Sequence, residues 1–455
     1  MTTEDKGRIL SESIKRLLRR GATPNLKKIV NRTHAADLSV VFRSLSLNNQ
    51  HKLFDMLDDV EQKAVLLSEL EEYTFLELVE HLDVEEIVEI FACMPADDVA
   101  DIVGKISKEK ADLILEKMKT EESEEVEELL GYEDDTAGGI MVPDFIALRD
   151  DLTAKDAIEA LQTKYHDVEM AFYIYVVDEF ERLVGVISLR QLVVVKPESQ
   201  LKNFMTTELF SVNTDRDQED VAALVSRYDI LAVPVVDDQN VLVGIVTVDD
   251  VIDILRREAT EDILKMAGVG EEFIETQSVI GSTKIRFPWL FASCVGGIFA
   301  FMIIGHFEES LVKFTYLAAF IPVIMGMGGN IGTQSSTIVV RGLATNRLDV
   351  RDLWPVVCKE LSVGTILGLI YGSLIGCVAQ FRFGTEVPSG MLAVSVGLAV
   401  LSSMSVAALV GSFVPMFFEK FHIDPAVATG PFVTTAIDII SVYCYFKIAT
   451  TLLGF

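Results

Sequence analysis

The sequence predicts a multidomain membrane protein: an acidic all-α domain of helical repeats, a duplicated α/β unit and a connecting helix, followed by five transmembrane helices. Three observations support this fold class. Residues 1–280 carry 60 acidic and 29 basic side chains, whereas residues 281–455 carry 9 and 10. The second part contains long apolar stretches that are typical of membrane spans. The first part changes near residue 137 from helical periodicity to β-rich runs that occur twice.

Residues 1–135 have the pattern of short amphipathic helices. Ile87 and Phe91, for example, fall on one apolar face, and Asp83 and Asp97 precede helical stretches at capping positions. The pattern recurs at irregular spacing, which indicates stacked helical repeats. The first turns contain clustered basic residues but no apolar core of the kind that a signal peptide needs, so no signal peptide is predicted.

Residues 136–250 contain one strand–turn–strand–helix pattern twice, in copies of about 137–200 and 201–250. Each copy has an apolar β-rich run, an acidic turn and a second run that contains glycine. The four runs are 172–177, 183–187, 232–236 and 242–246. A duplicated unit of this size and order resembles a tandem CBS-domain pair.

Residues 251–283 are predicted to form a helix that connects the duplicated unit to the membrane. Carboxylates recur along its start at spacings of three and four residues, and they are Asp250, Asp253, Glu258, Glu261 and Asp262. Such a helix repels itself unless cations or basic groups screen the charges. The same residues also suit an ordinary solvated face that Arg256 and Arg257 help to neutralise. The pattern alone therefore leaves cation sensing and a solvated surface open.

Residues 284–455 contain five apolar stretches, and we expect each to span a membrane. The stretches are 287–304, 316–340, 361–381, 391–418 and 427–455. Basic residues precede the first stretch and crowd the loop after the second. The positive-inside rule therefore places the N-terminal region in the cytoplasm and the C-terminus outside. Glycines every fourth residue in the third stretch predict close helix packing without a polar role.

Asp438 lies deep in the fifth apolar stretch. A carboxylate at bilayer depth costs at least ~2.5 kcal/mol, so a chain keeps one where it faces water, a cation or a proton path. Thr434, Thr435 and Ser441 lie three or four residues away, which predicts one stripe of oxygen-bearing side chains. The alternative is a buried Asp that neighbouring hydroxyls or Lys447 satisfy.

The second stretch is rich in glycine and neutral oxygens, including Asn330, Thr333 and Gln334. Neutral oxygens and one carboxylate suit a hard divalent cation that keeps its waters, as Mg²⁺ does. One carboxylate is a poor cation site, whereas two copies of Asp438 across a two-fold axis would neutralise a divalent ion. The pattern therefore predicts a homodimer with the ion path on its axis.

Together these features resemble the MgtE family of magnesium channels and transporters. The resemblance rests on the domain order, on the sequence GMGGNIG at 326–332 and on PFVTTAID at 431–438. It implies a homodimer in the lipid of the cell (inner) membrane, with Mg²⁺ as substrate and regulator. Matched by motif, Asp438 would bind hydrated Mg²⁺, Asn330 would lie nearby, and Asp424 would lie at the cytoplasmic entrance.

The family resemblance also implies that cytosolic Mg²⁺ closes the ion path by bridging acidic surfaces. Without the cation these surfaces repel one another, and with it the closed state gains the differential binding energy. The implied positions are Asp97 and Asp101 in the helical domain, Asp217, Glu219 and Asp229 in the second CBS copy, and Asp250, Asp253, Glu258, Glu261 and Asp262 on the connecting helix.

A CBS pair also implies an adenosine nucleotide such as ATP, for which Tyr173, Arg190 and Thr247 are the candidate residues. In CBS relatives an Asp that binds the ribose follows the last Ser or Thr of each copy. The second copy has Thr247 and Asp250, but the first has Gln191 in place of the Asp. ATP binding is therefore left open.

Several other functions fit the sequence less well. The acidic soluble region argues against nucleic acid as a partner, and the cysteines and histidines lack the spacing of zinc ligands. An intramembrane aspartyl protease needs two deep carboxylates, whereas Glu360 and Asp424 lie at span ends, so the chain is not expected to be an enzyme. The remaining alternatives are a transporter of Mn²⁺, Co²⁺ or Ca²⁺ and a membrane-bound nucleotide sensor without transport.

Overall fold

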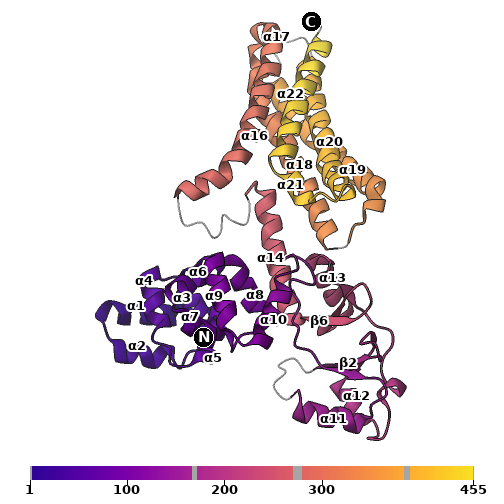
Figure 1. The fold of residues 1–455 in the computed structure, drawn as a ribbon. Coiled ribbons are helices and arrows are strands. Elements are labelled where there is room, and N and C mark those ends of the chain that lie inside the picture. Colours follow the sequence, from indigo (N-terminus) through magenta and orange to yellow (C-terminus); the bar gives the residue numbers. More distant parts are fainter. Residues whose placement is uncertain (1–2, 166–171, 270–278, 346, 384–389, 454–455) are drawn as a thin grey trace. The chain divides into compact units, whose positions relative to one another are not determined.

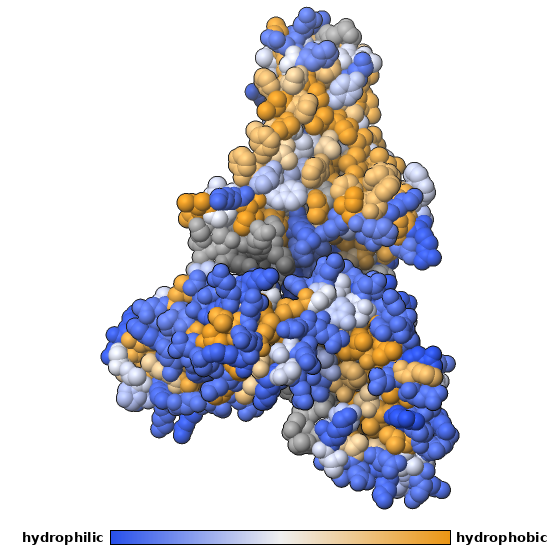
Figure 2. Space-filling view, in the orientation of Figure 1, coloured by the Kyte–Doolittle hydropathy of each residue, from blue (hydrophilic) through white to orange (hydrophobic). Residues whose placement is uncertain are grey.

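The chain forms two compact units, Met1–Arg256 and Arg257–Phe455. The computed structural model describes residues 3–165, 172–269, 279–345, 347–383 and 390–453 (Figure 1). Hydrophobic residues gather over the surface of the helical bundle in the second unit, whereas the surface of the first is mostly hydrophilic (Figure 2). This division agrees with the charge and hydropathy division of the sequence.

The first part of unit 1 is a two-layered stack of short helices. Within the described residues these helices are α1 Thr3–Arg20, α2 Thr23–Val30, α3 Ala35–Phe42, α4 Leu47–Phe54, α5 Val60–Ser68, α6 Glu72–His81, α7 Val84–Phe91, α8 Ala96–Lys105, α9 Lys108–Lys117 and α10 Thr120–Leu129. Helices α3, α5, α7 and α9 pack in succession, and α4, α6, α8 and α10 form a second row. Phe42, Phe54 and Phe91 are buried in the core between them. The predicted helical repeats are confirmed.

Two three-stranded sheets follow, with the same topology in each copy of the duplicated unit. Their strands are β1 Ala147–Arg149, β2 Tyr173–Val177 and β3 Leu183–Ser188, then β4 Val212–Asn213, β5 Ala232–Val236 and β6 Leu242–Thr247; their helices are α11 Ala154–Thr163, α12 Leu189–Val194 and α13 Gln218–Tyr228. In each sheet the first pair of strands is parallel and the second antiparallel. A register shift falls at the end of the middle strand in both copies.

The methionine near the start of each CBS copy packs against a glycine of the other copy. These contacts help to fix how the two copies pair. Met205 opens the second copy, but it lies against Gly185 of the first, where a Cβ would approach its sulfur to 2.4 Å. Met141 opens the first copy and lies against Gly244 of the second in the same way, with the corresponding distance 2.6 Å. Any side chain at either glycine would displace a methionine. The glycine in each second strand is thus explained by a close approach between the copies.

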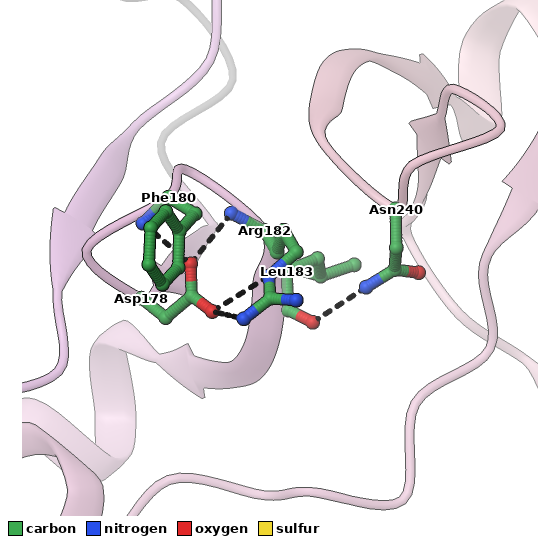
Figure 3. A network of polar contacts seen from close by, with 5 residues as sticks. All are labelled: Asp178, Phe180, Arg182, Leu183 and Asn240. Atoms are coloured by element: carbon green, nitrogen blue, oxygen red, sulfur yellow. Dashed lines mark hydrogen bonds and ion pairs between the residues drawn. The ribbon is translucent and has the colours of Figure 1, made fainter.

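The acidic turn between the paired strands is built in the same way in both copies. Asp178 accepts hydrogen bonds from the backbone N–H groups of Phe180 (2.8 Å) and Arg182 (3.0 Å), and Asp237 accepts two in the second copy. The Arg182 side chain also pairs with Asp178, and Asn240 donates across to the Leu183 carbonyl at 3.0 Å (Figure 3). The turns therefore join the two sheets as well as closing each hairpin.

Five described helices in the second part are long and apolar enough to cross a membrane. They are α16 Val279–His306, α18 Ile321–Ala344 with the 3₁₀ turn Thr315–Phe320 before it, α19 Leu353–Phe383, α20 Met391–Lys420 and α22 Pro431–Leu453. Short helices α17 Glu308–Lys313 and α21 Pro425–Thr429 accompany them, and the connecting helix α14 covers Val248–Met266. The chain is therefore a multi-pass membrane protein.

The described helix bounds differ from the sequence prediction at several places, including α14 and the fifth apolar stretch. Helix α14 begins at Val248, directly after β6, and ends at Met266, so it is shorter at its far end than the predicted 251–283; residues 270–278 lie outside the described part. The fifth apolar stretch is broken at Gly430 into α21 and α22, because Pro431 cannot donate a hydrogen bond to the preceding turn.

Close backbone contact holds α19 against α20, as the glycine pattern predicts. A Cβ on Gly372 would lie 2.5 Å from the Gly397 carbonyl oxygen, and one on Gly376 would lie 2.5 Å from that of Ala393. In lipid, where apolar burial drives association little, such small-residue contacts supply the packing energy.

We predict that Gly372→Ala lowers the thermal stability of the detergent-solubilised chain, because its methyl group would push α20 away at a cost of about 1–3 kcal/mol. Gly297→Ala is the matched control, since nothing lies within 4 Å of its added Cβ. The control should be neutral or stabilising, because alanine favours helix by about 0.5–1 kcal/mol. Thermal denaturation followed by size-exclusion chromatography compares the two, and equal shifts would contradict the packing argument.

Candidate functional site

An acidic cavity of about 580 Å³ lies within unit 1 where α8, α10, β6 and the start of α14 meet. Its wall carries carboxylates from four segments of the sequence: Asp97 and Asp98, Glu122 and Glu125, Asp144, and Asp249 and Asp250. Because Pro95 is the cap of α8, Asp97 lies in the first helical turn rather than at the predicted capping position. The fold therefore gathers negative charge in one space, which attracts cations.

Burial and mutual repulsion make these carboxylates costly to ionise. Burial, then the charges of Asp98 and Asp250, raises the pKa of Asp97 to about 8. Burial, then the charges of Asp250 and Asp101, raises the pKa of Asp98 to about 7. Burial also raises the pKa of Asp250 to about 6, although its hydrogen bond with Thr247 acts in the opposite direction. Groups with such shifts near one another are typical of sites that bind a cation.

The donor set suits a partly hydrated cation better than a closed metal cage. The Oδ1 atom of Asp97 is buried and has no hydrogen-bond partner among the described residues. Within that part of the chain, no three His, Cys, Asp or Glu side chains converge on one point. Mg²⁺ keeps several waters and accepts one or two protein carboxylates, so Asp97 and Asp250 fit its requirements.

The other predicted regulatory residues of unit 1 do not line this cavity. Asp101 and Asp253 are exposed on α8 and α14. Asp217 is the N-cap of α13 and accepts a hydrogen bond from the Glu219 N–H at 2.8 Å, whereas Asp229 is the left-handed C-cap of the same helix. The two caps are separated by about 18 Å, since they are twelve residues apart and a helix rises 1.5 Å per residue. The described fold therefore brings Asp97 and Asp250 together, but not Asp217 and Asp229.

A second cluster lies in unit 2, where the end of α14 meets the start of α21. Lys265 forms ion pairs with Glu261 and, at 2.6 Å, with Asp424. Asp424 is also the N-cap of α21 and accepts a hydrogen bond from the Ala426 N–H at 2.7 Å. Burial, then the charge of Asp424, raises the pKa of Asp262 to about 6. Three predicted metal ligands, Glu261, Asp262 and Asp424, thus lie around one lysine.

Lys265 was not among the basic residues expected to neutralise this helix, which were Arg256 and Arg257. Burial would lower the pKa of Lys265, but its hydrogen bonds to Asp424 and Glu261 outweigh burial and raise it. The ammonium group is thus firmly charged, and it balances part of the negative charge that a divalent cation would otherwise meet. The signal in the sequence was the i, i+4 spacing of Glu261 and Lys265.

Asp438 lies half-buried on α22, and the hydroxyls at the neighbouring positions of the predicted stripe form their hydrogen bonds with other groups. The Thr434 hydroxyl donates to the Gly430 carbonyl at 3.2 Å, and Ser441 accepts from Ser403 of α20 at 2.8 Å. The Thr435 methyl lies against α16, where a Cβ on Gly296 would approach it to 1.8 Å. Within the described residues Asp438 therefore has no hydrogen bond or ion pair, so neighbouring hydroxyls do not satisfy it.

Asn330 belongs to a polar stripe exposed along α18. Thr333, Gln334 and Thr337 follow it at helical spacing and are exposed in the same way. The opposite side of the helix packs inward, where Cβ atoms on Gly328 and Gly332 would meet Ser403 and Ile437. The glycines therefore seat α18 against α20 and α22, while the neutral oxygens lie on the accessible surface of the single chain.

Glu360 is a buried carboxyl group that the sequence reasoning placed at a span end. It lies within α19, is 5% exposed, and accepts a hydrogen bond from Ser335 of α18 at 2.9 Å. The helix begins at Leu353, several residues before the apolar stretch, and this extension buries Glu360. Burial depends on the helices that surround a residue, so the hydropathy pattern could not reveal it.

The candidate nucleotide residues come from both CBS copies. Tyr173 begins β2, Arg190 is exposed on α12, and Thr247 is buried at the end of β6. Thr247 is hydrogen-bonded to Asp250, and Gln191 takes the corresponding position in the first copy, where it accepts from the Ser188 N–H at 2.8 Å. Asp and Gln thus both stabilise the start of the helix that follows.

Comparisons with known proteins agree with this architecture from end to end. Family models match the chain as an MgtE intracellular N domain at residues 33–135, as CBS domains at 137–197 and 201–257, and as an MgtE divalent cation transporter domain at 321–448. A magnesium transporter MgtE of Thermus thermophilus is 35% identical over 450 residues, which cover 98% of both chains. That of Bacillus subtilis is 32% identical over 437 residues, 95% of each.

The chain belongs to the MgtE family. A third relative, the magnesium transporter MgtE of Enterococcus faecalis, is 38% identical over 331 residues, which are 73% of this chain and 72% of that protein. The solved cytosolic domain of the Mg²⁺ channel MgtE in complex with ATP matches with a TM-score of 0.51 and 35% identity, covering 54% of this chain and 99% of that one. MgtE membership confirms the predicted fold class, and the family model that matches the membrane helices is described as a divalent cation transporter.

We predict that unit 1 loses stability as pH rises from about 4 to about 8 when divalent cations are chelated. Because the folded-state pKa values of Asp97, Asp98 and Asp250 are raised, the folded state binds more protons than the unfolded state in this range. Stability must then fall with rising pH, by about 1 kcal/mol or more per group. Urea titration of the full chain at several pH values measures this slope.

The double variant Asp97→Asn/Asp250→Asn should flatten that pH dependence, and Mg²⁺ should restore stability to the wild-type chain at pH 8. A slope that is unchanged in the double variant would show that other groups cause it.

Proposed function

We propose that this chain is a Mg²⁺ transporter in which two copies form an ion path at Asp438, and that cytosolic Mg²⁺ closes the path. The observation that carries the proposal is the state of Asp438. It is a half-buried carboxyl group within a membrane helix, and its neighbouring hydroxyls are engaged elsewhere. An ionised group at that depth needs a compensating charge or water.

The polar stripe of α18 supports a wet path rather than a lipid-facing surface. Asn330, Thr333 and Gln334 are exposed in the single chain although α18 is a membrane span. Amide and hydroxyl groups are costly against acyl chains, so a surface of this kind is covered by protein or water. Neutral oxygens along a path can replace outer-shell hydration of a cation without binding it too tightly.

A second copy supplies the charge that the site lacks. One carboxylate leaves a divalent ion half-neutralised, whereas Asp438 and its counterpart across a two-fold axis balance both charges. Because Mg²⁺ releases its waters reluctantly, two carboxylates can hold the hydrated ion without stripping it. The relatives that match nearly the whole chain are named as magnesium transporters, which favours Mg²⁺ over Mn²⁺, Co²⁺ or Ca²⁺.

For closure, the acidic cavity and the Lys265 cluster provide the cation-sensitive contacts. Asp97 and Asp250 are forced together by the fold, so their contact is weak without a cation and strong with one. Further carboxylates that Mg²⁺ can bridge lie along α14 and at the start of α21: Glu258, Glu261, Asp262 and Asp424. Lys265 already supplies one positive charge there. Mg²⁺ that binds only the docked arrangement shifts the population toward it.

ATP remains a second candidate ligand, at Tyr173, Arg190 and Thr247. A related cytosolic domain is described in complex with ATP. Here the Gln191 amide replaces a carboxylate that would accept hydrogen bonds from both ribose hydroxyls. We therefore expect weaker nucleotide binding than in relatives that carry the acidic residue. The proposed orientation in the inner membrane places unit 1 in the cytoplasm and the C-terminus outside.

We predict that Asp438→Ala and Asp438→Asn abolish Mg²⁺ uptake, since neither retains the charge that holds the ion. Growth of a Mg²⁺-uptake-deficient bacterium in low Mg²⁺ reports the function, and Mg²⁺ flux into proteoliposomes reports the rate. Glu309→Gln, at an exposed position within α17, is the matched loss of one carboxylate and should transport normally. Rescue of growth by either variant would contradict the proposal that Asp438 holds the ion in the path.

We predict that Asp250→Asn/Glu258→Gln gives a leaky transporter, because fewer carboxylates remain for cytosolic Mg²⁺ to bridge. Flux into proteoliposomes should fall at millimolar internal Mg²⁺ for the wild-type chain but persist for the variant. Glu116→Gln/Glu127→Gln changes the same net charge at exposed positions of α9 and α10 and should close normally. Normal closure of the Asp250/Glu258 variant would refute the gating part while leaving transport untouched.

A further inference from the structure

The N-terminal end of the chain has a charge opposite to that of the region it belongs to. Residues 1–32 contain 9 basic and 3 acidic side chains, whereas residues 33–280 contain 20 and 57. The family model of the N domain begins only at residue 33. A soluble surface intersperses charges of both signs, whereas here the basic side chains are concentrated at one end of an otherwise acidic region. This basic end therefore calls for another explanation.

Helix α1 divides these residues between a packed side and a charged side. Ile14 is fully buried, and Leu10, Leu17 and Leu18 pack against the core of the helical stack. The basic residues occupy the remaining surface, where Arg8, Arg16, Arg19 and Arg20 are exposed and Lys15 is half-exposed. A free basic amphipathic helix would insert its apolar side into a membrane or wrap into a partner groove. Here most of that side is packed against the core and only Ile9 remains exposed, so the accessible surface of α1 is mainly polar.

Two shallow hollows follow the charged side of α1. One, of about 660 Å³, is lined by Ile9, Glu12, Ser13, Lys15, Arg16, Arg19 and Arg20. The other, of about 240 Å³, lies between α1 and the α3–α4 turn and is lined by Lys15, Leu18, Arg19, Ser44, Leu45, Ser46 and Asn49. The guanidinium groups of arginine, and the side chains of serine and asparagine beside them, are hydrogen-bond donors of the kind that bind phosphate oxygens.

These cations are not used inside the folded unit. Nearby basic residues do find partners: Lys27 pairs with Asp58 at 2.5 Å and Arg43 with Glu71 at 3.1 Å. In the described residues, by contrast, the five basic side chains at positions 8–20 of α1 have no ion pair. The acidic surface of the same unit is available at high local concentration and is not engaged. Their partner is therefore a different anionic surface.

We infer that the charged side of α1 binds the phosphate headgroups of anionic phospholipid at a membrane surface. Five helices of the same chain fix the protein to a membrane, so headgroups are always within reach of a tethered domain. Electrostatic attraction acts within about 10 Å at physiological salt, so the local positive charge decides the contact despite the net charge of −30. Each Lys or Arg near an anionic leaflet adds about 1 kcal/mol, which is about fivefold in binding.

The test uses the full chain in nanodiscs of neutral phosphatidylcholine, mixed with separate vesicles and floated on a density gradient. Wild-type nanodiscs should float with vesicles that contain phosphatidylserine, but not with pure phosphatidylcholine vesicles. Arg16→Gln/Arg19→Gln/Arg20→Gln should lower the partition coefficient by about tenfold or more. Glu12→Gln removes the acidic residue within the first hollow and should raise it several-fold, a gain that misfolding cannot produce.

The matched control Lys108→Gln/Lys155→Gln/Lys202→Gln removes the same charge from exposed positions outside α1 and should float like the wild-type chain. Equal flotation of the triple arginine variant and wild type would overturn the inference. So would loss of flotation on adding inorganic phosphate at constant ionic strength, which would assign the hollow to free anions. Nanodiscs that associate with one another without vesicles would assign α1 to a second copy of the chain instead.

Discussion

Uncompensated carboxylates are the constraint around which this molecule is arranged. An ionised carboxyl group placed in a low-dielectric space, or beside another one, must find a cation, a proton or water. The fold creates this condition at three places: in the cavity at Asp97 and Asp250, at Asp262 beside Asp424, and within the membrane at Asp438. At each place the carboxylates lower the stability of the chain unless a cation, a proton or water compensates them. The rest of the structure holds these groups where they cannot separate freely.

The supporting fold does this with small residues and local hydrogen bonds rather than with ion pairs. Gly372 and Gly376 bring α19 and α20 into backbone contact, and Gly328 and Gly332 bring α18 against its neighbours. In the soluble part, Gly185 and Gly244 let each CBS copy receive a methionine from the other. Such contacts are rigid, because a backbone has few ways to yield. Rigid supports allow repelling charges to remain close, whereas flexible ones would let them relax apart.

Lys265 places a positive charge of the chain itself among the carboxylates of the second cluster. Its ammonium group contacts Asp424 and Glu261, so one unit of positive charge is always present at that contact. The carboxylates of this cluster are therefore already partly neutralised, whereas among the described residues no basic side chain is a main cause of the pKa shifts of Asp97 and Asp250.

The sequence alone determined the domain order, the five spans, the family and the individual acidic residues, because periodicity, hydropathy and motif spacing are local properties. It could not determine which carboxylates meet: Asp97 and Asp250 converge while the two ends of α13 stay apart. It also could not determine the hydrogen-bond partner of Ser441 beside Asp438 or the depth of Glu360, because both depend on packed neighbours from other helices. Those outcomes depend on distances between residues far apart in the chain, and only the tertiary structure sets such distances.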